Sequence, residues 1–321
     1  MTNVLLSAEG LTKHFPVRGG GLARAVDGVD FQVKQGGALG LVGESGCGKT
    51  TTGRMLVRLL EPTGGRIVFD GRDITHLRRS QLRPIRHQLQ IIFQDPYASL
   101  NPRHTVGRIV AMPLQVNRIR PAGGMKARVQ ELLEIVGLNP EHYNRYPHES
   151  SGGQRQRVGI ARALALQPRL IVADEPVSAL DVSIQAQIIN LLRSLQRDLG
   201  LTFVFITHDL AVVSLFCPEV AVMYLGKIVE VGDRADIFAH PQHPYTRALM
   251  SAVPDPAALG TSRRIRLSGD VPSALNPPSG CRFRTRCPQA RERCSGDEPA
   301  LVTRGATQRT ACHFPEAIAP Q

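Results

Sequence analysis

The sequence lacks any apolar run near the 18 residues or so that a membrane-spanning helix requires. The N-terminal residues Met1-Thr2-Asn3-Val4 also lack the basic and apolar regions of a signal peptide. No internal repeat is evident along the chain. We therefore expect a cytosolic protein that does not itself span a membrane.

A nucleic-acid motif is also missing, although the chain is strongly basic. Its 321 residues include 39 Lys and Arg against 27 Asp and Glu, which gives a formal net charge of +12. Such an excess suits nucleic acid, anionic lipid or phosphate ligands. Because no nucleic-acid motif accompanies the charge, we favour a basic surface on a soluble protein that works near an anionic membrane.

One segment fits the phosphate-binding pattern GxxxxGK[ST], namely Gly43-Glu44-Ser45-Gly46-Cys47-Gly48-Lys49-Thr50. Its glycines let backbone N–H groups surround phosphates, Lys49 adds a charge at the β/γ-phosphates, and Thr50 offers a hydroxyl to Mg²⁺. An apolar strand expected over Ala38 to Val42 precedes the loop, and a helix expected over Thr51 to Leu60 follows it. The predicted nucleotide-binding residues are Gly43, Ser45, Gly46, Cys47, Gly48, Lys49, Thr50 and Thr51.

A second motif, the acidic pair Asp174-Glu175, follows an apolar strand expected over Leu170 to Ala173. Alone, the pair Asp174-Glu175 would be read as a solvated helix start. Downstream of a phosphate loop it lies where α/β sheets hold their ligands, at the carboxyl end of a strand. We expect Asp174 to help hold Mg²⁺ through its water shell, and Glu175 to orient or deprotonate the attacking water.

The remaining pattern alternates strands and helices, as expected of an α/β domain. The further expected elements are strands over Val4 to Leu11, Ala25 to Val33, Leu89 to Phe93 and Thr202 to Thr207, helical stretches between Thr105 and Gly137 that include Met125 to Val136, and helices over Gln154 to Ala165 and Ser183 to Leu199.

Between the two nucleotide motifs stands Ser151-Gly152-Gly153-Gln154, with a helix expected to open at Gln154. Its backbone donors could present a helix N-terminus to a second anion. With this segment the sequence resembles the ATP-binding subunits of ABC transporters. The resemblance implies an α/β P-loop NTPase core, an antiparallel β subdomain and an inserted helical subdomain over about residues 95–165, all within a cassette of residues 1–253.

In that family the Ser-Gly-Gly-Gln signature caps the γ-phosphate held by the other cassette of a dimer. Ser150 stands where the family usually has Leu, so we expect altered packing under the loop and retained phosphate contact. The resemblance assigns Asp181 to communication across the dimer, His208 to the γ-phosphate, and Gln94 to the metal or water. It also places Phe15 against adenine, where a π face suffices for stacking, although an ordinary core Phe is the alternative.

Two further stretches resemble the dipeptide and oligopeptide importer branch: Asp95-Pro96-Tyr97-Ala98-Ser99-Leu100-Asn101-Pro102, and His240-Pro241-Gln242-His243-Pro244-Tyr245-Thr246. The resemblance implies an ATPase subunit that powers peptide import from the cytoplasmic face of the inner membrane. Its expected partners are a homologous second ATPase, two transmembrane permease subunits and, indirectly, an extracytoplasmic substrate-binding protein, with no nucleic acid. Nickel, glutathione or opines remain alternative cargoes, and a soluble ABC ATPase acting on nucleic acid is the alternative from another class.

The composition changes over residues 254–321, where Pro, Arg and Cys become frequent. Four of the six cysteines lie there, and disulfides are unfavourable in a reducing cytosol, so we read the set as metal ligands. Its C-x5-C-x6-C-x17-C spacing matches neither the common zinc patterns nor the ferredoxin runs. A similar set in related importer ATPases implies a [4Fe–4S] cluster, with zinc and free thiols as alternatives. The predicted ligands are Cys281, Cys287, Cys294 and Cys312.

Overall fold

The computed structural model describes residues 3–17, 19–252 and 265–315. The chain divides into two compact units. The first contains Met1–His76 and Phe205–Gln321, and the second contains Leu77–Val204. The predicted boundary between a cassette and an extension, at residues 253 and 254, lies outside the described residues.

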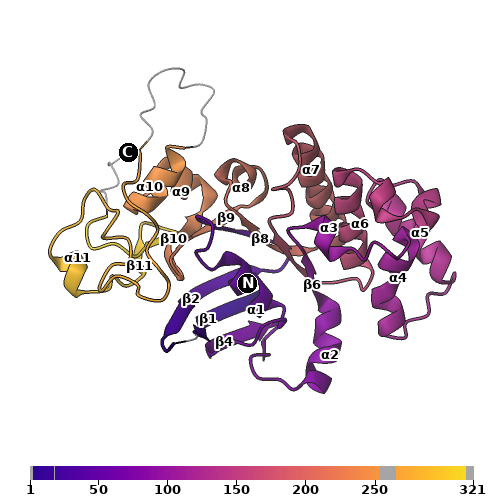
Figure 1. Cartoon of the computed structure of the whole chain (residues 1–321), viewed down its shortest axis with the longest axis horizontal. Helices are drawn as coiled ribbons and strands as arrows, with labels where there is room; N and C mark the ends of the chain where they lie inside the picture. Colours follow the sequence, from indigo (N-terminus) through magenta and orange to yellow (C-terminus); the bar gives the residue numbers. More distant parts are fainter. Residues whose placement is uncertain (1–2, 18, 253–264, 316–321) are drawn as a thin grey trace. The chain divides into compact units, whose positions relative to one another are not determined.

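The first unit holds two sheets (Figure 1). One is four-stranded, with the order β2-β1-β4-β5 and antiparallel pairing throughout, which is the predicted antiparallel β subdomain. Its strands are β1 (Val4–Pro16), β2 (Leu22–Lys34), β4 (Gly64–Phe69) and β5 (Arg72–Asp73). Apolar side chains such as Leu6, Leu11 and Val29 are buried, as half-covered strands require.

The other sheet of the first unit has the strand order β11-β12-β10-β9-β3. Its strands are β3 (Ala38–Val42), β9 (Glu219–Tyr224), β10 (Lys227–Asp233), β11 (Val302–Arg304) and β12 (Gln308–Thr310). β3 pairs with β9 in parallel, whereas β10 pairs with β9 and β12 in antiparallel fashion. The chain's last strands therefore extend the sheet that begins next to the phosphate loop.

The helices of the first unit are α1 (Lys49–Leu56), α8 (Leu210–Phe216), α9 (Arg234–Ala239), α10 (Pro244–Met250) and α11 (Arg293–Gly296). α1 follows β3 after the phosphate loop, as predicted, but ends four residues earlier than expected. Arg58 adopts a φ of 54°, and its buried side chain donates from Nε to the Ile74 carbonyl oxygen over 3.0 Å. This left-handed residue ends the helix before the glycine pair at 64 and 65.

The second unit is mostly helical. It contains α2 (Arg79–Gln88), α3 (Pro96–Ser99), α4 (Val106–Val116), α5 (Met125–Ile135), α6 (Gly152–Leu164), α7 (Val182–Leu199), the short 3₁₀ turns Pro140–Asn144 and Pro147–Glu149, and the parallel strands β6 (Leu89–Ile92) and β7 (Leu170–Asp174). α4, α5 and α6 pack on one another, so the predicted helical subdomain is present. β8 (Thr202–Thr207) contains the boundary between the units.

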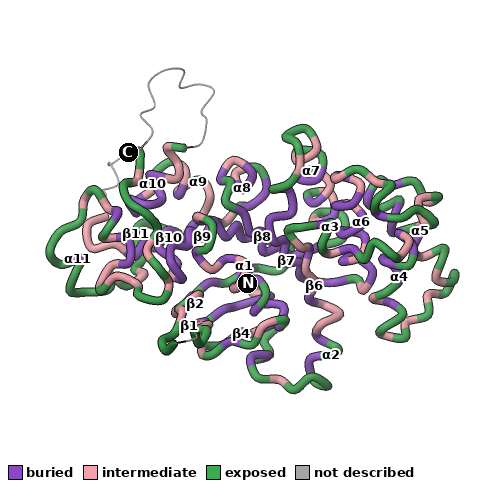
Figure 2. Tube along the Cα trace, in the orientation of Figure 1, coloured by how far each residue is buried: buried purple, intermediate pink, exposed green. Residues whose placement is uncertain are grey.

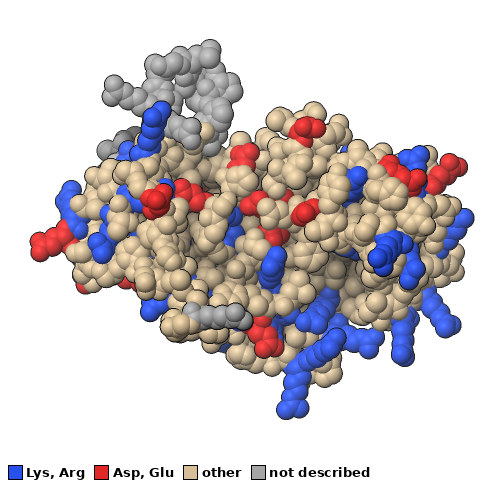
Figure 3. Space-filling model, viewed as in Figure 1, with Lys and Arg blue, Asp and Glu red and all other residues tan. Residues whose placement is uncertain are grey.

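Burial follows the strands, and β7 and β8 are buried along their whole length (Figure 2). Such continuous apolar strands are typical of a sheet covered on both faces. Basic side chains gather instead near α2 and α4 of the second unit (Figure 3). The exposed arginines there are Arg78, Arg79, Arg83, Arg108, Arg118 and Arg120.

Candidate functional site

The phosphate loop of the first unit connects β3 to α1. Lys49 is buried, and its Nζ donates to the carbonyl oxygens of Gly43 and Glu44 over 2.7 and 2.9 Å. A buried ammonium needs such acceptors. The loop thus keeps the lysine charge inside the turn, where the motif predicts the β- and γ-phosphates.

Two glycines of the loop are required by close approach of the backbone. A Cβ at Gly43 would lie 2.1 Å from the Met223 carbonyl oxygen, and a Cβ at Gly48 would lie 2.1 Å from the Ala25 carbonyl oxygen. Gly48 also has a φ of 107° at the start of α1. Only glycine fits these positions, which supports the motif-based assignment of the loop.

The other residues of the first unit that are predicted to contact the nucleotide differ in exposure. Phe15 lies near the end of β1 and is 37% exposed, with Lys13 Nζ 5.2 Å from its ring centroid. An exposed ring is available for base stacking, whereas a core Phe would be buried. His208, directly after β8, is also exposed. Cys47 is instead buried, and burial raises the pKa of its thiol.

Glu44 is a residue of this loop that the motif does not assign. Its carboxylate accepts two hydrogen bonds from Arg286, and its backbone N–H donates to the Tyr245 hydroxyl oxygen. The available signal in the sequence was the charge itself, because a carboxylate beside a phosphate site requires a cationic partner. Which cation supplies it could not be read from the sequence.

In the second unit, β7 ends at the predicted carboxylates. Asp174 is 2% exposed and Glu175 is 9% exposed. Glu175 has a φ of 45°, a left-handed conformation that a non-glycine residue adopts at some energetic cost. The Gln94 side-chain Nε2 donates to Glu175 Oε2 over 2.9 Å. The structure therefore brings together two of the predicted catalytic residues within this unit.

The signature segment starts helix α6. Ser151 is its N-cap, with Oγ accepting from the Gln154 N–H over 3.3 Å, while Gln154 Oε1 accepts from the Ser151 N–H over 3.1 Å. This reciprocal capping box holds the loop in shape. A Cβ at Gly153 would lie 2.7 Å from Ile184 Cγ2, so the loop packs closely on α7. Asp181, the exposed N-cap of α7, belongs to that same region.

Ser150, which replaces the usual leucine, is half-buried. Nearby, the importer-type motif after Gln94 contacts α6. The Arg155 guanidinium carbon lies 3.8 Å from the centroid of the Tyr97 ring, and Arg155 Nε donates to the Pro147 carbonyl oxygen over 2.6 Å. Arg162 donates to the Ser99 carbonyl oxygen over 2.6 Å. The motif thus connects the segment following Gln94 with the signature helix.

The four C-terminal cysteines line one small cavity of the first unit, together with His243 and His313. The Cys281 N–H donates to the Cys294 carbonyl oxygen over 2.9 Å, and all four thiols are free. Burial, with the neighbouring thiols adding to it, raises the pKa values of Cys281, Cys287 and Cys312. Across the described residues, no group of three or more His, Cys, Asp or Glu is arranged to hold a metal ion.

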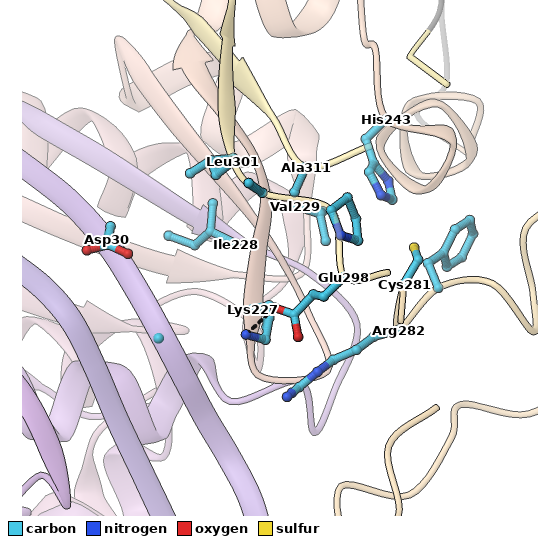
Figure 4. A pocket seen from close by; sticks show the side chains of 14 residues that line it. Asp30, Lys227, Ile228, Val229, His243, Cys281, Arg282, Glu298, Leu301 and Ala311 are labelled. Carbon is cyan, nitrogen blue, oxygen red and sulfur yellow. Dashed lines mark ion pairs between the residues drawn. The ribbon is translucent and has the colours of Figure 1, made fainter. Parts of the chain in front are cut away.

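Beside this cavity lies a pocket of about 150 Å³ between β2, β10 and the C-terminal segment (Figure 4). Lys227 Nζ and Glu298 Oε1 form an ion pair across it at 2.5 Å. Arg282 reaches past it to donate to the carboxylate of Asp27. Burial raises the pKa of Asp27, but the hydrogen bond from His14 and the charges of Arg282 and Lys227 outweigh burial and lower it. These charged groups fasten the C-terminal segment to the β subdomain.

Comparison with known proteins now identifies the chain's relatives. The ABC transporter family matches residues 26–178, and the oligopeptide/dipeptide transporter C-terminal region matches residues 229–294. A putative peptide import ATP-binding protein of Brucella ovis is 54% identical over 297 residues, which cover 92% of this chain and 93% of the relative. The chain belongs to the ABC transporter family.

Other relatives agree with this assignment. The oligopeptide transport ATP-binding protein AppF of Bacillus subtilis is 49% identical, over 97% of each chain. Among solved structures, the dimeric post-hydrolysis cassette MJ0796 bound to ADP and Pi matches with a TM-score of 0.65 and 30% identity, covering 71% of this chain and 98% of that one. CbiO1 of Clostridium perfringens matches with a TM-score of 0.65 and 31% identity, over 74% and 91%.

These findings confirm the predicted P-loop ABC ATPase fold and the prediction of an ATPase that serves transport. Within the described part of the chain, no helix is both long and apolar enough to cross a membrane.

Proposed function

We propose that this chain hydrolyses ATP to power the import of di- and oligopeptides. The observation that carries the proposal is the match of residues 229–294 to the oligopeptide/dipeptide transporter C-terminal region. The relatives named for peptide import match over nearly the whole chain, so they cover this region as well as the cassette. The cassette match is described only as ABC transporter, whereas the C-terminal match is described as oligopeptide/dipeptide transporter, so the second carries the cargo class.

The proposed roles follow from chemistry and placement. Lys49 and the loop N–H groups bind the phosphates, and Phe15 stacks on adenine. When bound, Mg²⁺ neutralises charge on the β- and γ-phosphates, with Thr50, Gln94 and Asp174 as its proposed protein-side ligands. Mg²⁺ is usually held by one or two carboxylates together with substrate phosphates and water, which fits an ion site that is incomplete without the nucleotide.

Hydrolysis is proposed to depend on Glu175 as the base that takes a proton from the attacking water. Its hydrogen bond from Gln94 holds the carboxylate in one orientation. His208 is assigned to the γ-phosphate, and Asp181 to contact with a second cassette. These assignments rest on the motif order and on the local geometry of each unit.

The proposed assembly is a dimer of cassettes on two membrane-spanning permease subunits, at the cytoplasmic face of the inner membrane. Ser151, Gly152, Gly153 and Gln154 would then act on the γ-phosphate bound by the other cassette, through the amino end of α6. In this family branch the second cassette is commonly a different chain, so we propose a heterodimer. A separate binding protein would deliver the peptide to the permeases.

A transport assay tests the function. The chain is reconstituted in liposomes with its cognate permeases, second cassette and binding protein, and uptake of labelled di- and pentapeptides is measured with ATP. Uptake of peptides, and not of nickel, glutathione or opines, is the expected result. A complex that takes up one of those cargoes and no peptide would contradict the proposal, and DNA-stimulated hydrolysis without permeases would favour the nucleic-acid alternative.

We further propose that the cysteine cavity holds a [4Fe–4S] cluster. Four Cys thiolates are the usual ligand set of such a cluster, and the four cysteines line one cavity. A single zinc ion would need all four sulfurs roughly 2.3 Å from one point. Zinc on the same four thiolates is the alternative, and metal and sulfide analysis of anaerobically purified protein distinguishes the two. Bound iron would cross-link this segment and so stabilise its fold.

A further inference from the structure

Glu44 presents an electrostatic problem within the phosphate loop. It directly follows Gly43, whose carbonyl oxygen accepts from Lys49. An unpaired carboxylate there would repel the triphosphate and compete for the Lys49 charge. The loop therefore needs a cation that neutralises Glu44.

Arg286 supplies that cation from the C-terminal segment. Its two terminal nitrogens donate to Glu44 Oε2 and Oε1 over 2.6 and 3.1 Å. The Arg286 side chain is only 7% exposed, and that of Glu44 is 29% exposed. Paired, two-point contacts of this kind fix orientation as well as charge. The Glu44 carboxylate is thus both neutralised and held in one direction.

Tyr245 holds the same residue through its backbone. The Glu44 N–H donates to the Tyr245 hydroxyl oxygen over 2.8 Å, and the Glu44 carbonyl oxygen accepts from Lys49. Tyr245 is fully buried, with ring centroids 4.7 Å from Tyr224 and 5.4 Å from Phe283. This packing fixes the ring and so keeps the hydroxyl beside the Glu44 N–H.

The surrounding C-terminal motif explains how both residues reach the loop. The Glu230 carboxylate accepts from the N–H groups of Gln242 and His243, at 2.8 and 3.0 Å, and so orders the turn before α10. Phe283 is 1% exposed and anchors the segment that carries Arg286. The packing that builds this region therefore delivers Tyr245 and Arg286 to one residue of the phosphate loop.

We propose that Arg286 and Tyr245 are positioning residues for ATP binding, which act through Glu44. Together they keep the first turn of the phosphate loop open to the phosphates and remove a negative charge from beside them. The C-terminal region is then part of the nucleotide-binding apparatus in addition to its place in the fold. This inference rests on the ABC ATPase fold and does not depend on which cargo is transported.

The test measures ATP affinity of the full-length chain with a fluorescent ATP analogue. In Arg286→Gln the unpaired carboxylate should weaken binding on the order of tenfold. The matched control is Arg284→Gln, which removes the same charge from the same segment but breaks bonds only to Ser279. The control should bind ATP as the unchanged protein does.

A double-mutant cycle distinguishes positioning from a general loss of structure. In the Glu44→Gln background, Arg286→Gln should have little further effect, because no carboxylate remains to be neutralised. Equal weakening in both backgrounds would overturn the proposal, as would an Arg286→Gln protein that binds ATP within twofold of the unchanged chain.

Two milder variants keep the test decisive if Arg286→Gln does not fold. Arg286→Lys keeps the charge and loses the two-point contact, so its affinity should lie between those of the unchanged chain and the Gln variant. Tyr245→Phe removes only the acceptor for the Glu44 N–H. In the assembled transporter it should raise the KM for ATP and leave kcat unchanged, and a fall in kcat alone would count against a positioning role.

Discussion

The Gln94 side chain donates a hydrogen bond to Glu175 over 2.9 Å, and so joins two loops that the sequence separates by 81 residues. Glu175 also adopts a left-handed backbone conformation. Strained residues persist where the surrounding structure over-determines them, and they cluster at functional sites. This relationship leads to the first prediction.

Glu175→Gln should strongly slow hydrolysis and preserve ATP binding. The amide keeps the shape of the side chain but cannot accept a proton from water, so turnover should fall roughly 100-fold or more. ATPase assays of the assembled transporter measure the loss, and ATP retention on gel filtration measures the trapped closed dimer. Glu134→Gln, an exposed change on α5, serves as the control. Near-normal turnover in Glu175→Gln would show that another group is the base.

Much of the nucleotide site could be predicted because its residues are close together in sequence. β3 occupies the predicted residues, and the loop that follows it has the glycines that close approach requires. The contact between Glu44 and Arg286 could not be predicted in this way. Arg286 is 242 residues away in the chain, and no local pattern encodes that pairing.

Sequence patterns also failed to predict helices and strands whose local composition or length does not favour them. α2 contains Pro84, which disfavours a helix interior, yet Leu82 and Ile85 are buried on one side of it. Tertiary packing of that apolar side outweighs the local preference. The strands β11 and β12 were missed because each is only three residues long; β12 is fixed by pairing with β10, and β11 by pairing with β12.

A second prediction concerns the signature segment and the partner cassette. The isolated chain should hydrolyse ATP slowly, because we propose that Ser151 acts on a nucleotide held by another cassette. Ser151→Leu in this chain should stop hydrolysis at the partner's site and leave ATP binding at the Lys49 loop intact. Native mass spectrometry of the purified transporter should find one copy of this chain and one of a homologous ATPase. Two copies with no second ATPase would contradict the heterodimer.

A third prediction concerns Tyr97, which is 65% exposed yet stacks on Arg155. Tyr97→Leu keeps an apolar side chain and removes the π face. Its cost to the free energy of unfolding should be about 0.5–1 kcal/mol, the usual value of an exposed cation–π contact. Urea unfolding measures this cost. Repeating the change in an Arg155→Lys background should give a smaller cost, and an undiminished one would mean that the stack contributes nothing.

The last prediction is that the four C-terminal cysteines bind one metal centre that orders their segment without taking part in hydrolysis. The segment has five prolines between Pro272 and Pro299 and few apolar residues, so it cannot easily bury a core of its own. Protein purified without oxygen should be brown and should contain about four irons and four acid-labile sulfides per chain.

Cys287→Ser should bleach that protein and increase proteolysis of the C-terminal segment. Cys217→Ser is the matched control: Cys217 is fully buried but is not among the cysteines that line the cavity, so its replacement should leave the iron content unchanged. ATP binding at Lys49 should persist in the bleached protein, although weakened if the loosened segment carries Arg286 away from Glu44. Colourless protein with stoichiometric zinc would exclude the iron–sulfur cluster but would still support a structural metal centre. Anaerobic protein with neither metal would contradict both, because the cysteines would then be free thiols around a small cavity.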